Sequence, residues 1–240
     1  MRKLSVVTLF CILALTAWTQ AQAPVEITAE PHHHLVVENK FVRAFAFSVD
    51  PGQSTLMHRH GHDYVSVFVG DSQALNIKEG AQPAPASFKD GDVKFAAAGV
   101  VHEVTDTGKT PVRNATIELL QPTTNAKACT ESCAVPIECP DADKGKCATV
   151  TKAFTSDQWT VTMVTIPVGG IYPEHSHTGG VLTVALTDAD VTMRSHSRSK
   201  DIHSKAGDIL WHEPETHIIL NIGKTPAKVA VLEFAGTAGK

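Results

Sequence analysis

The stretch TLMHRHGHDY, residues 55–64, contains residue types that bind metal ions, at a spacing that brings them together. His58 and His60 flank Arg59. Because successive side chains of a β-strand point to opposite faces, both imidazoles of this pair lie on one face. A third histidine, His102, follows some forty residues later. Three imidazoles can hold one face of a metal ion and leave its opposite face open.

The same pattern occurs a second time. His175 and His177 flank Ser176, and His217 follows some forty residues later. A single pair of histidines on a strand is often only solvated. The recurrence of the pair together with its third histidine favours two metal sites.

Two further residues are candidates at the first site only. Asp63 is either a fourth ligand or a cap of the turn at Gly61, and His62 is either a fourth ligand or part of the pocket wall. The second half has Thr178 and Gly179 after its histidine pair and offers no carboxylate there.

The histidine pattern belongs to a longer internal repeat. DTGKTPVRNATIELL from residue 106 returns as NIGKTPAKVAVLEF from 221, and PGQSTLMHRH from 51 aligns with VGGIYPEHSH from 168. The offset stays between 115 and 117 residues throughout. A register held for that long indicates two copies of one structural unit.

Both copies have the pattern of β-strands. Apolar and polar residues alternate in 41–49, 64–70, 160–168 and 228–234, with Gly, Pro and Asp between the runs. No segment has a helical period. Many short strands separated by turns predict an all-β chain of two sandwiches or barrels.

Glycines and histidines at fixed spacing carry a resemblance to a known family. In the first half they are Gly52, His58, His60, Gly70, Gly91, Gly99 and His102; in the second they are Gly169, His175, His177, Gly207 and His217. This arrangement resembles the two sequence motifs of the cupin superfamily. The resemblance implies two tandem cupin-type jelly-roll β-barrels, at 24–122 and 150–236, with a cysteine-bearing linker at 123–149.

The resemblance also implies a metal-dependent activity. It assigns His58, His60 and His102, and separately His175, His177 and His217, to a divalent transition metal; Fe, Cu, Zn, Mn and Ni all suit imidazole ligands. Neither copy has the glutamate that cupins commonly supply three or four residues past the second histidine. Three-histidine cupins include dioxygenases, so dioxygenase-like oxidation of a small anionic or chelating substrate is the leading hypothesis. A lyase or isomerase and a non-catalytic binding protein are the alternatives.

The N-terminus and the cysteines indicate export. Residues 1–21 carry Arg2, Lys3 and an apolar run, which predicts a signal peptide and a secreted or periplasmic protein. Four cysteines lie close together, and an even number in an exported chain predicts two disulfides, although the spacing leaves the pairing open. A zinc knot is the alternative. These cysteines are Cys129, Cys133, Cys139 and Cys147.

Charge limits the partners. Removal of Arg2 and Lys3 with the signal changes the net charge from −4 to −6, which argues against nucleic acid. No other apolar stretch is long enough to span a membrane. We expect a small-molecule substrate, no membrane association after signal removal, and a homodimer of the kind that cupins form.

Three other features need a structure. His32 to His34 are adjacent, and we expect them to begin a strand. Alternation predicts that either Trp211 or His212 faces the interior of the second barrel, and Trp211 is the expected core residue. Alternatively, His212 forms a polar rim near His217 with Glu213 and Glu215.

Overall fold

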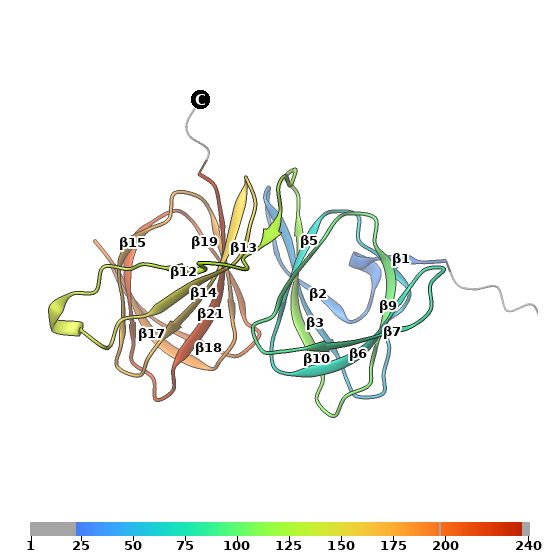
Figure 1. The fold of residues 1–240 in the computed structure, drawn as a ribbon, viewed down its shortest axis with the longest axis horizontal. Coiled ribbons are helices and arrows are strands. Elements are labelled where there is room, and N and C mark those ends of the chain that lie inside the picture. Colours follow the sequence, from blue (N-terminus) through green and yellow to red (C-terminus); the bar gives the residue numbers. More distant parts are fainter. Residues whose placement is uncertain (1–22, 197, 237–240) are drawn as a thin grey trace, which may run out of the picture.

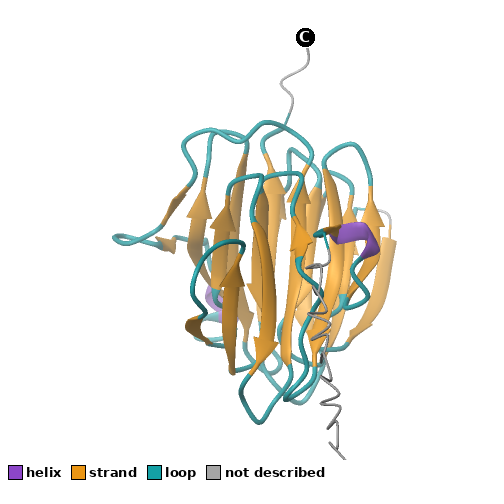
Figure 2. Ribbon diagram, turned by 90° about the vertical axis from the view of Figure 1, so that its right-hand side faces the viewer, coloured by secondary structure: helices purple, strands orange, loops and turns teal. Residues whose placement is uncertain are grey.

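The computed structural model describes residues 23–196 and 198–236. The predicted signal peptide lies outside these residues. The described chain is almost entirely β-structure, with two short 3₁₀ helices, η1 (Ile27–Ala29) and η2 (Asp141–Asp143). Figure 1 shows two β-barrels side by side, and Figure 2 looks onto the first of them, where strands dominate. The predicted all-β fold of two tandem barrels is confirmed.

The first barrel consists of two five-stranded sheets, ordered β1-β4-β9-β6-β7 and β2-β3-β10-β5-β8. All pairs except the parallel pair β1–β4 are antiparallel. The strands are β1 (Val25–Glu26), β2 (His33–Glu38), β3 (Val42–Val49), β4 (His58–Arg59), β5 (Tyr64–Phe68), β6 (Ser72–Lys78), β7 (Ala84–Phe88), β8 (Val93–Ala96), β9 (Val101–Asp106) and β10 (Val112–Leu119).

The second barrel repeats this plan with sheets β15-β20-β17-β18 and β11-β13-β14-β21-β16-β19, and β12 pairs with β13. Its strands are β11 (Lys127–Ala128), β12 (Ala134–Val135), β13 (Thr149–Thr155), β14 (Trp159–Ile166), β15 (Ile171–Ser176), β16 (Val181–Ala185), β17 (Ala189–Ser195), β18 (Arg198–Ser204), β19 (Ile209–His212), β20 (Thr216–Asn221) and β21 (Ala227–Phe234).

Strand register relates the two barrels residue by residue. In the first barrel, Asn114 of β10 lies opposite Phe47 of β3; in the second, Val229 of β21 lies opposite Val164 of β14. The same correspondence holds for the antiparallel strand pair that brings two histidines together in each barrel. His102 lies opposite His58, as His217 lies opposite His175.

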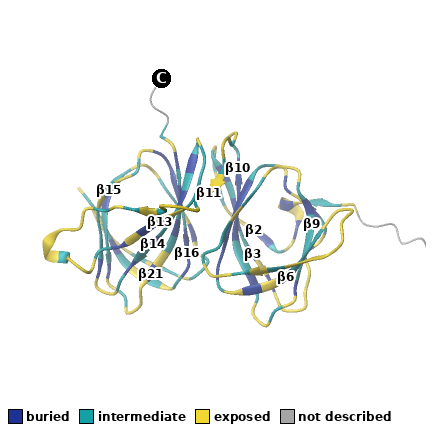
Figure 3. Cartoon of the chain, viewed as in Figure 1, coloured by how far each residue is buried: buried dark blue, intermediate teal, exposed yellow. Residues whose placement is uncertain are grey.

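The largest apolar core lies between the barrels rather than inside either one. It joins β3, β5 and β10 of the first barrel to β14, β16 and β21 of the second. Leu182 and Ile117 are completely buried there. Figure 3 shows this buried zone along the strands where the two barrels meet. The glycine of each barrel's Gly-Asp turn approaches the other barrel: a Cβ at Gly91 would lie 3.2 Å from Met163, and one at Gly207 would meet Arg113.

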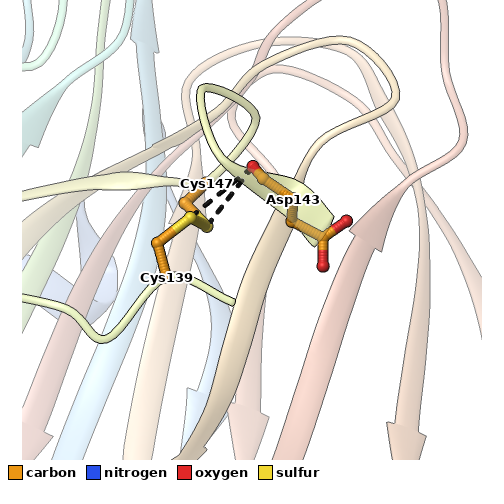
Figure 4. The surroundings of a disulfide bond; sticks show 3 residues. All are labelled: Cys139, Asp143 and Cys147. Atoms are coloured by element: carbon orange, nitrogen blue, oxygen red, sulfur yellow. Dashed lines mark hydrogen bonds between the residues drawn. A yellow bond between two sulfur atoms is a disulfide. The ribbon is translucent and has the colours of Figure 1, made fainter. Parts of the chain in front are cut away.

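The cysteine segment lies over the second barrel. Two disulfides join Cys129 to Cys133 and Cys139 to Cys147, which settles the pairing that the sequence left open and excludes the zinc knot. Figure 4 shows the second disulfide beside Asp143, whose carbonyl oxygen lies near both sulfur atoms. β11 and β12 pair with β13, so this segment adds to the sheet of the second barrel. Within the described part of the chain, no helix combines the length and apolar character of a membrane span.

Replacement of Leu182 by alanine tests the core between the barrels. The side chain is fully buried, so its truncation should leave a cavity and lower the free energy of unfolding by about 2–5 kcal/mol. Urea unfolding followed by tryptophan fluorescence measures the change. Leu35→Ala is the matched control, because Leu35 is 49% exposed and should cost about 0.5 kcal/mol or less. Equal losses in the two variants would contradict this account of the core.

Candidate metal centres

Two adjacent strands position the first three histidines. His58 lies in β4 and His60 directly follows it, while His102 of β9 is opposite His58. The backbone N–H of His60 donates to the carbonyl of Val100, and the carbonyl of His60 accepts from the N–H of Gly99. These bonds continue the antiparallel pairing past the end of β4, so the alternation that the sequence implied holds through His60. One nitrogen from each ring lies within 4.8 Å of the other two.

Hydrogen bonds fix the tautomers of two of these rings. His58 donates from Nδ1 to the carbonyl of Leu56 at 2.8 Å, and His102 donates from Nδ1 to Oδ1 of Asn76 at 2.9 Å. Both therefore carry an unprotonated Nε2, the form that ligates a metal. His60 Nε2 lies 3.1 Å from His102 Nε2.

An unpaired nitrogen at this site fits a metal ion. His58 Nε2 and His60 Nδ1 are buried without a hydrogen-bond partner, although buried polar atoms are normally paired. Three imidazoles are the donors that first-row transition metals accept. The donor set, the short distance between ligand atoms and the unpaired His58 Nε2 therefore fit a divalent transition metal.

Burial keeps these imidazoles neutral. It lowers the pKa of His58 to about 4, that of His60 to about 2 and that of His102 to about 3. The neighbouring imidazoles add to each shift, because one charged ring disfavours another. The ring of Tyr64 stacks on His60 with centroids 3.9 Å apart, and burial raises the pKa of that phenol to about 12.

The second site has the same framework. His175 of β15 and His217 of β20 are opposite each other, His177 follows β15, and their ligand atoms again lie within 4.8 Å of one another. His175 donates from Nδ1 to the carbonyl of Pro173 at 2.8 Å, as His58 does to Leu56. Burial lowers the pKa of His175 to about 4 and also lowers that of His217.

Carboxylates distinguish the second site from the first. Glu233 of β21 accepts a hydrogen bond from Nδ1 of His177 at 3.1 Å, and Glu215 Oε1 lies 3.4 Å from Nδ1 of His217. The contact with Glu233 points the Nε2 atom of His177 toward the shared site.

This difference in carboxylate contacts arises from one residue that is arginine in the first barrel and threonine in the second. Glu118 occupies the register position of Glu233, but Arg43 binds it at 2.7 Å. Thr160 takes the place of Arg43 in the second barrel. Glu233 is therefore free to bind His177, whereas Nδ1 of His60 has no partner.

Each site opens into a cavity within its barrel. The first cavity, of about 160 Å³, is lined by the three histidines, aromatic rings and polar side chains. The second, of about 280 Å³, is lined by its three histidines and mainly by aliphatic side chains. The two cavities therefore differ in size and in the polarity of their walls.

The two extra candidates at the first site are not among the three ligand atoms that lie within 4.8 Å of one another. Asp63 Oδ1 accepts a hydrogen bond at 2.8 Å from the backbone N–H of Ala98. His62 lies half-buried in the bend between β4 and β5. The group of ligand atoms within 4.8 Å consists of His58, His60 and His102.

The structure adds a pair to the first site that the sequence did not indicate. His33 begins β2, in agreement with the expectation that the His32–His34 run begins a strand, and its side chain is buried. Its Nδ1 donates to Glu30 at 2.7 Å, and its ring lies 4.9 Å from that of His58. The run of three adjacent histidines is the sequence feature that could have indicated a role for His33. Glu30 lies before the strand, and no spacing in the sequence relates it to the site.

The prediction for Trp211 and His212 is wrong. His212 lines the second cavity, and Trp211 faces the first barrel, where it stacks on Phe41 with centroids 5.7 Å apart. Trp211 is a core residue, but of the core between the barrels. Of the alternative polar rim, Glu215 lies beside His217, whereas Glu213 accepts a hydrogen bond from Trp211.

Comparisons with known proteins agree with this architecture. No protein-family model and no curated protein matches the sequence. Among solved structures, the chain is similar to AerE from Microcystis aeruginosa (TM-score 0.58, 12% identity, 86% of this chain and 98% of that one). It is also similar to a cupin 2 conserved barrel domain protein from Leptotrichia buccalis (TM-score 0.53, 11% identity, 85% of this chain and 88% of that one). A third similar structure is the oxalate decarboxylase of Lactobacillus farciminis (TM-score 0.55, 12% identity, 85% of this chain and 84% of that one). At such identities the likeness shows the fold alone.

Replacement of Asn76 by leucine tests the support of the first site. Loss of the hydrogen bond to Nδ1 of His102 should lower the metal affinity of that site about 10- to 100-fold. Competition against a chromophoric chelator measures both sites, and the second should be unchanged. Met193→Leu is the matched control, because Met193 holds the register position that corresponds to Asn76 and its side chain has no hydrogen-bonding amide. Unchanged affinity in Asn76→Leu would contradict a supporting role.

The lowered imidazole pKa values predict how pH affects the metal-free protein. Below about pH 6.5 the unfolded chain binds protons on imidazoles that the folded chain keeps neutral. The free energy of unfolding must therefore decrease as the pH is lowered. Between pH 7.5 and 5.0 the loss should reach about 2 kcal/mol for each fully buried imidazole, a window in which carboxylates contribute little. Urea unfolding of chelator-treated protein measures it. His60→Asn should reduce this loss of unfolding free energy, whereas His203→Asn should not, because His203 is exposed. An unfolding free energy that does not change with pH would contradict the burial of neutral imidazoles.

Proposed function

Since the chain folds as two tandem cupin-type barrels, we propose that it is a metal-dependent oxidoreductase of dioxygenase type. Its substrate in this proposal is a small anionic or chelating molecule. The metal ligands are His58, His60 and His102 in the first barrel and His175, His177 and His217 in the second.

One observation carries the proposal. Each site combines three imidazoles, and the ligand group contains no carboxylate. Such a set leaves the full charge of a divalent ion in place and fills only half of an octahedral shell. Room remains for a chelating substrate and a small second reactant on the side of the cavity.

A redox-active metal bound there would supply activation of dioxygen. The residues of the chain would hold and orient it. His58 and His175 are fixed by backbone carbonyls, and His177 is fixed by Glu233. Aromatic stacking of Tyr64 on His60 and of Tyr172 on His175 covers one side of each site. The apolar walls of the second cavity exclude water from a bound substrate.

Glu233 favours a second candidate function. Its carboxylate lines the second cavity beside His177 and is half-buried. A carboxylate close to a Lewis-acidic metal can move a proton, as a lyase or isomerase requires. This chemistry needs neither dioxygen nor a redox-active metal, so the choice of metal separates the two candidates.

The chain's location and organisation are part of the proposal. The two disulfides are compatible with an exported protein, as the predicted signal peptide at 1–21 requires. We propose that the exported chain works as two barrels, 24–122 and 150–236, joined by the segment 123–149.

Metal analysis and oxygen uptake test the proposal. The protein should bind two metal ions, His60→Ala and His177→Ala one each, and the double variant none. After loading with Fe(II), addition of diketones, flavonols or thiols should cause oxygen consumption with one class, and loading with Zn(II) should abolish it. Absence of metal from the wild-type chain would overturn the proposal. Turnover with Zn(II) and without oxygen would replace it with the lyase or isomerase.

A further inference from the structure

We infer that the second barrel binds a ligand with a metal-chelating head and an apolar tail, and that the first barrel excludes the tail. The inference rests on the proposed metal at His175, His177 and His217. It adds the chemical class of the molecule that binds there.

The second cavity extends away from the histidines along β21. Ala227, Val229, Val231 and Glu233 line it, and alternation places all four on one face of the strand. The six residue-to-residue steps from Ala227 to Glu233 span about 20 Å of strand. Glu233 contacts His177, so the cavity runs from the metal site toward Ala227 along an apolar wall.

Bulky side chains of the first cavity are replaced by small ones in the second. By strand register, Tyr64 corresponds to Val181 and Phe68 to Ala185. Phe88, which stacks on Phe68 with centroids 3.7 Å apart, corresponds to Ser204. The rings fill the space in the first barrel that remains open in the second, in line with volumes of about 160 and 280 Å³.

Polar side chains of the first cavity are likewise replaced by apolar ones. Asn114 and Thr116 of β10 correspond to Val229 and Val231 of β21. The exchange extends to β6 and β8, where Asn76 corresponds to Met193 and Lys94 to Leu210. All eight residues line their respective cavities. Along the aliphatic side chains that make up most of the second cavity's wall, a polar tail would lose its hydration and gain few partners, whereas an apolar tail is stabilised there.

The head must suit the histidine end. Polar groups at that end include Glu233 and the pair of Thr183 and His212, whose Oγ1 and Nε2 lie 3.3 Å apart. A second carboxylate on the ligand would face Glu233. The head is therefore a neutral or singly charged bidentate oxygen chelator rather than a dianion.

A homologous series of hydroxamic acids tests the inference, because the head chelates Zn(II) and only the tail varies. The full chain with His60→Ala, loaded with Zn(II), retains the second site alone. Calorimetry with aceto-, butano-, hexano- and octanohydroxamic acid should show binding about fourfold tighter for each added methylene until the cavity is filled. The chain with His177→Ala reports the first barrel, and its affinity should not rise beyond the butano compound.

Two variants that introduce first-barrel residues sharpen the test. In the His60→Ala chain, Ala185→Phe should block the longer tails and leave acetohydroxamate binding unchanged. Val231→Thr keeps the shape of the side chain and adds a hydroxyl, so it should reduce the increase in hydroxamate affinity for each added methylene. This variant tests the inference independently if Ala185→Phe does not fold. Zinc content and circular dichroism verify each variant.

The outcomes separate the two proposals. If the second site retains zinc but the affinity for the hydroxamic acids does not depend on the length of their alkyl chain, the apolar-tail inference is overturned and the proposed metal centre stands. An equal chain-length gain in both barrels would also overturn it. No zinc at the second site would overturn the proposed function and this inference with it.

Discussion

The burial of uncharged imidazoles in the barrel interiors is the constraint on which the rest of the structure depends. A charged ring in such surroundings is costly, and burial lowers the pKa of His58 and of His175 to about 4. Neutral rings have one N–H and one lone pair, so an acceptor for Nδ1 decides where the lone pair points. Backbone carbonyls two residues before His58 and His175 serve this purpose in both barrels. The orientation of His58 and His175 thus follows from strand pairing and from the need to satisfy the Nδ1–H of each ring.

The two barrels keep this framework and differ in the groups around it. In the first, Arg43 binds the buried Glu118, and a second buried pair, Glu30 and His33, lies against His58. In the second, Thr160 replaces Arg43 and Glu233 turns to the metal site. One change of side chain therefore converts a structural ion pair into a support for a ligand. The strand register is common to both barrels, whereas the hydrogen-bond partners of the ligands are not.

The sequence predicted the parts that depend on spacing along one strand or on the repeat. The all-β fold and its two copies followed from alternation and a constant offset, and the six histidines are brought together in two groups. Partners across strands were missed, because a sequence does not state which residue of β21 faces β15; Glu233 is one such case. The error at Trp211 has a different cause. Large apolar residues were assigned to the interior of a barrel, but the outer face of β19 is also buried, against Phe41 of the first barrel.

That second buried face fixes the register of the site. On β21, Val229 and Val231 line the cavity, while Ala230 and Leu232 pack in the core between the barrels. A slip of one residue would move Leu232 into the cavity and Glu233 into the apolar interface. Burying an unpaired carboxylate there is far costlier than exposing one on a solvated face. The contact between the barrels therefore specifies which side chains of β21 reach the metal site. In a single barrel with a solvated outer face, alternation alone would specify them less strongly.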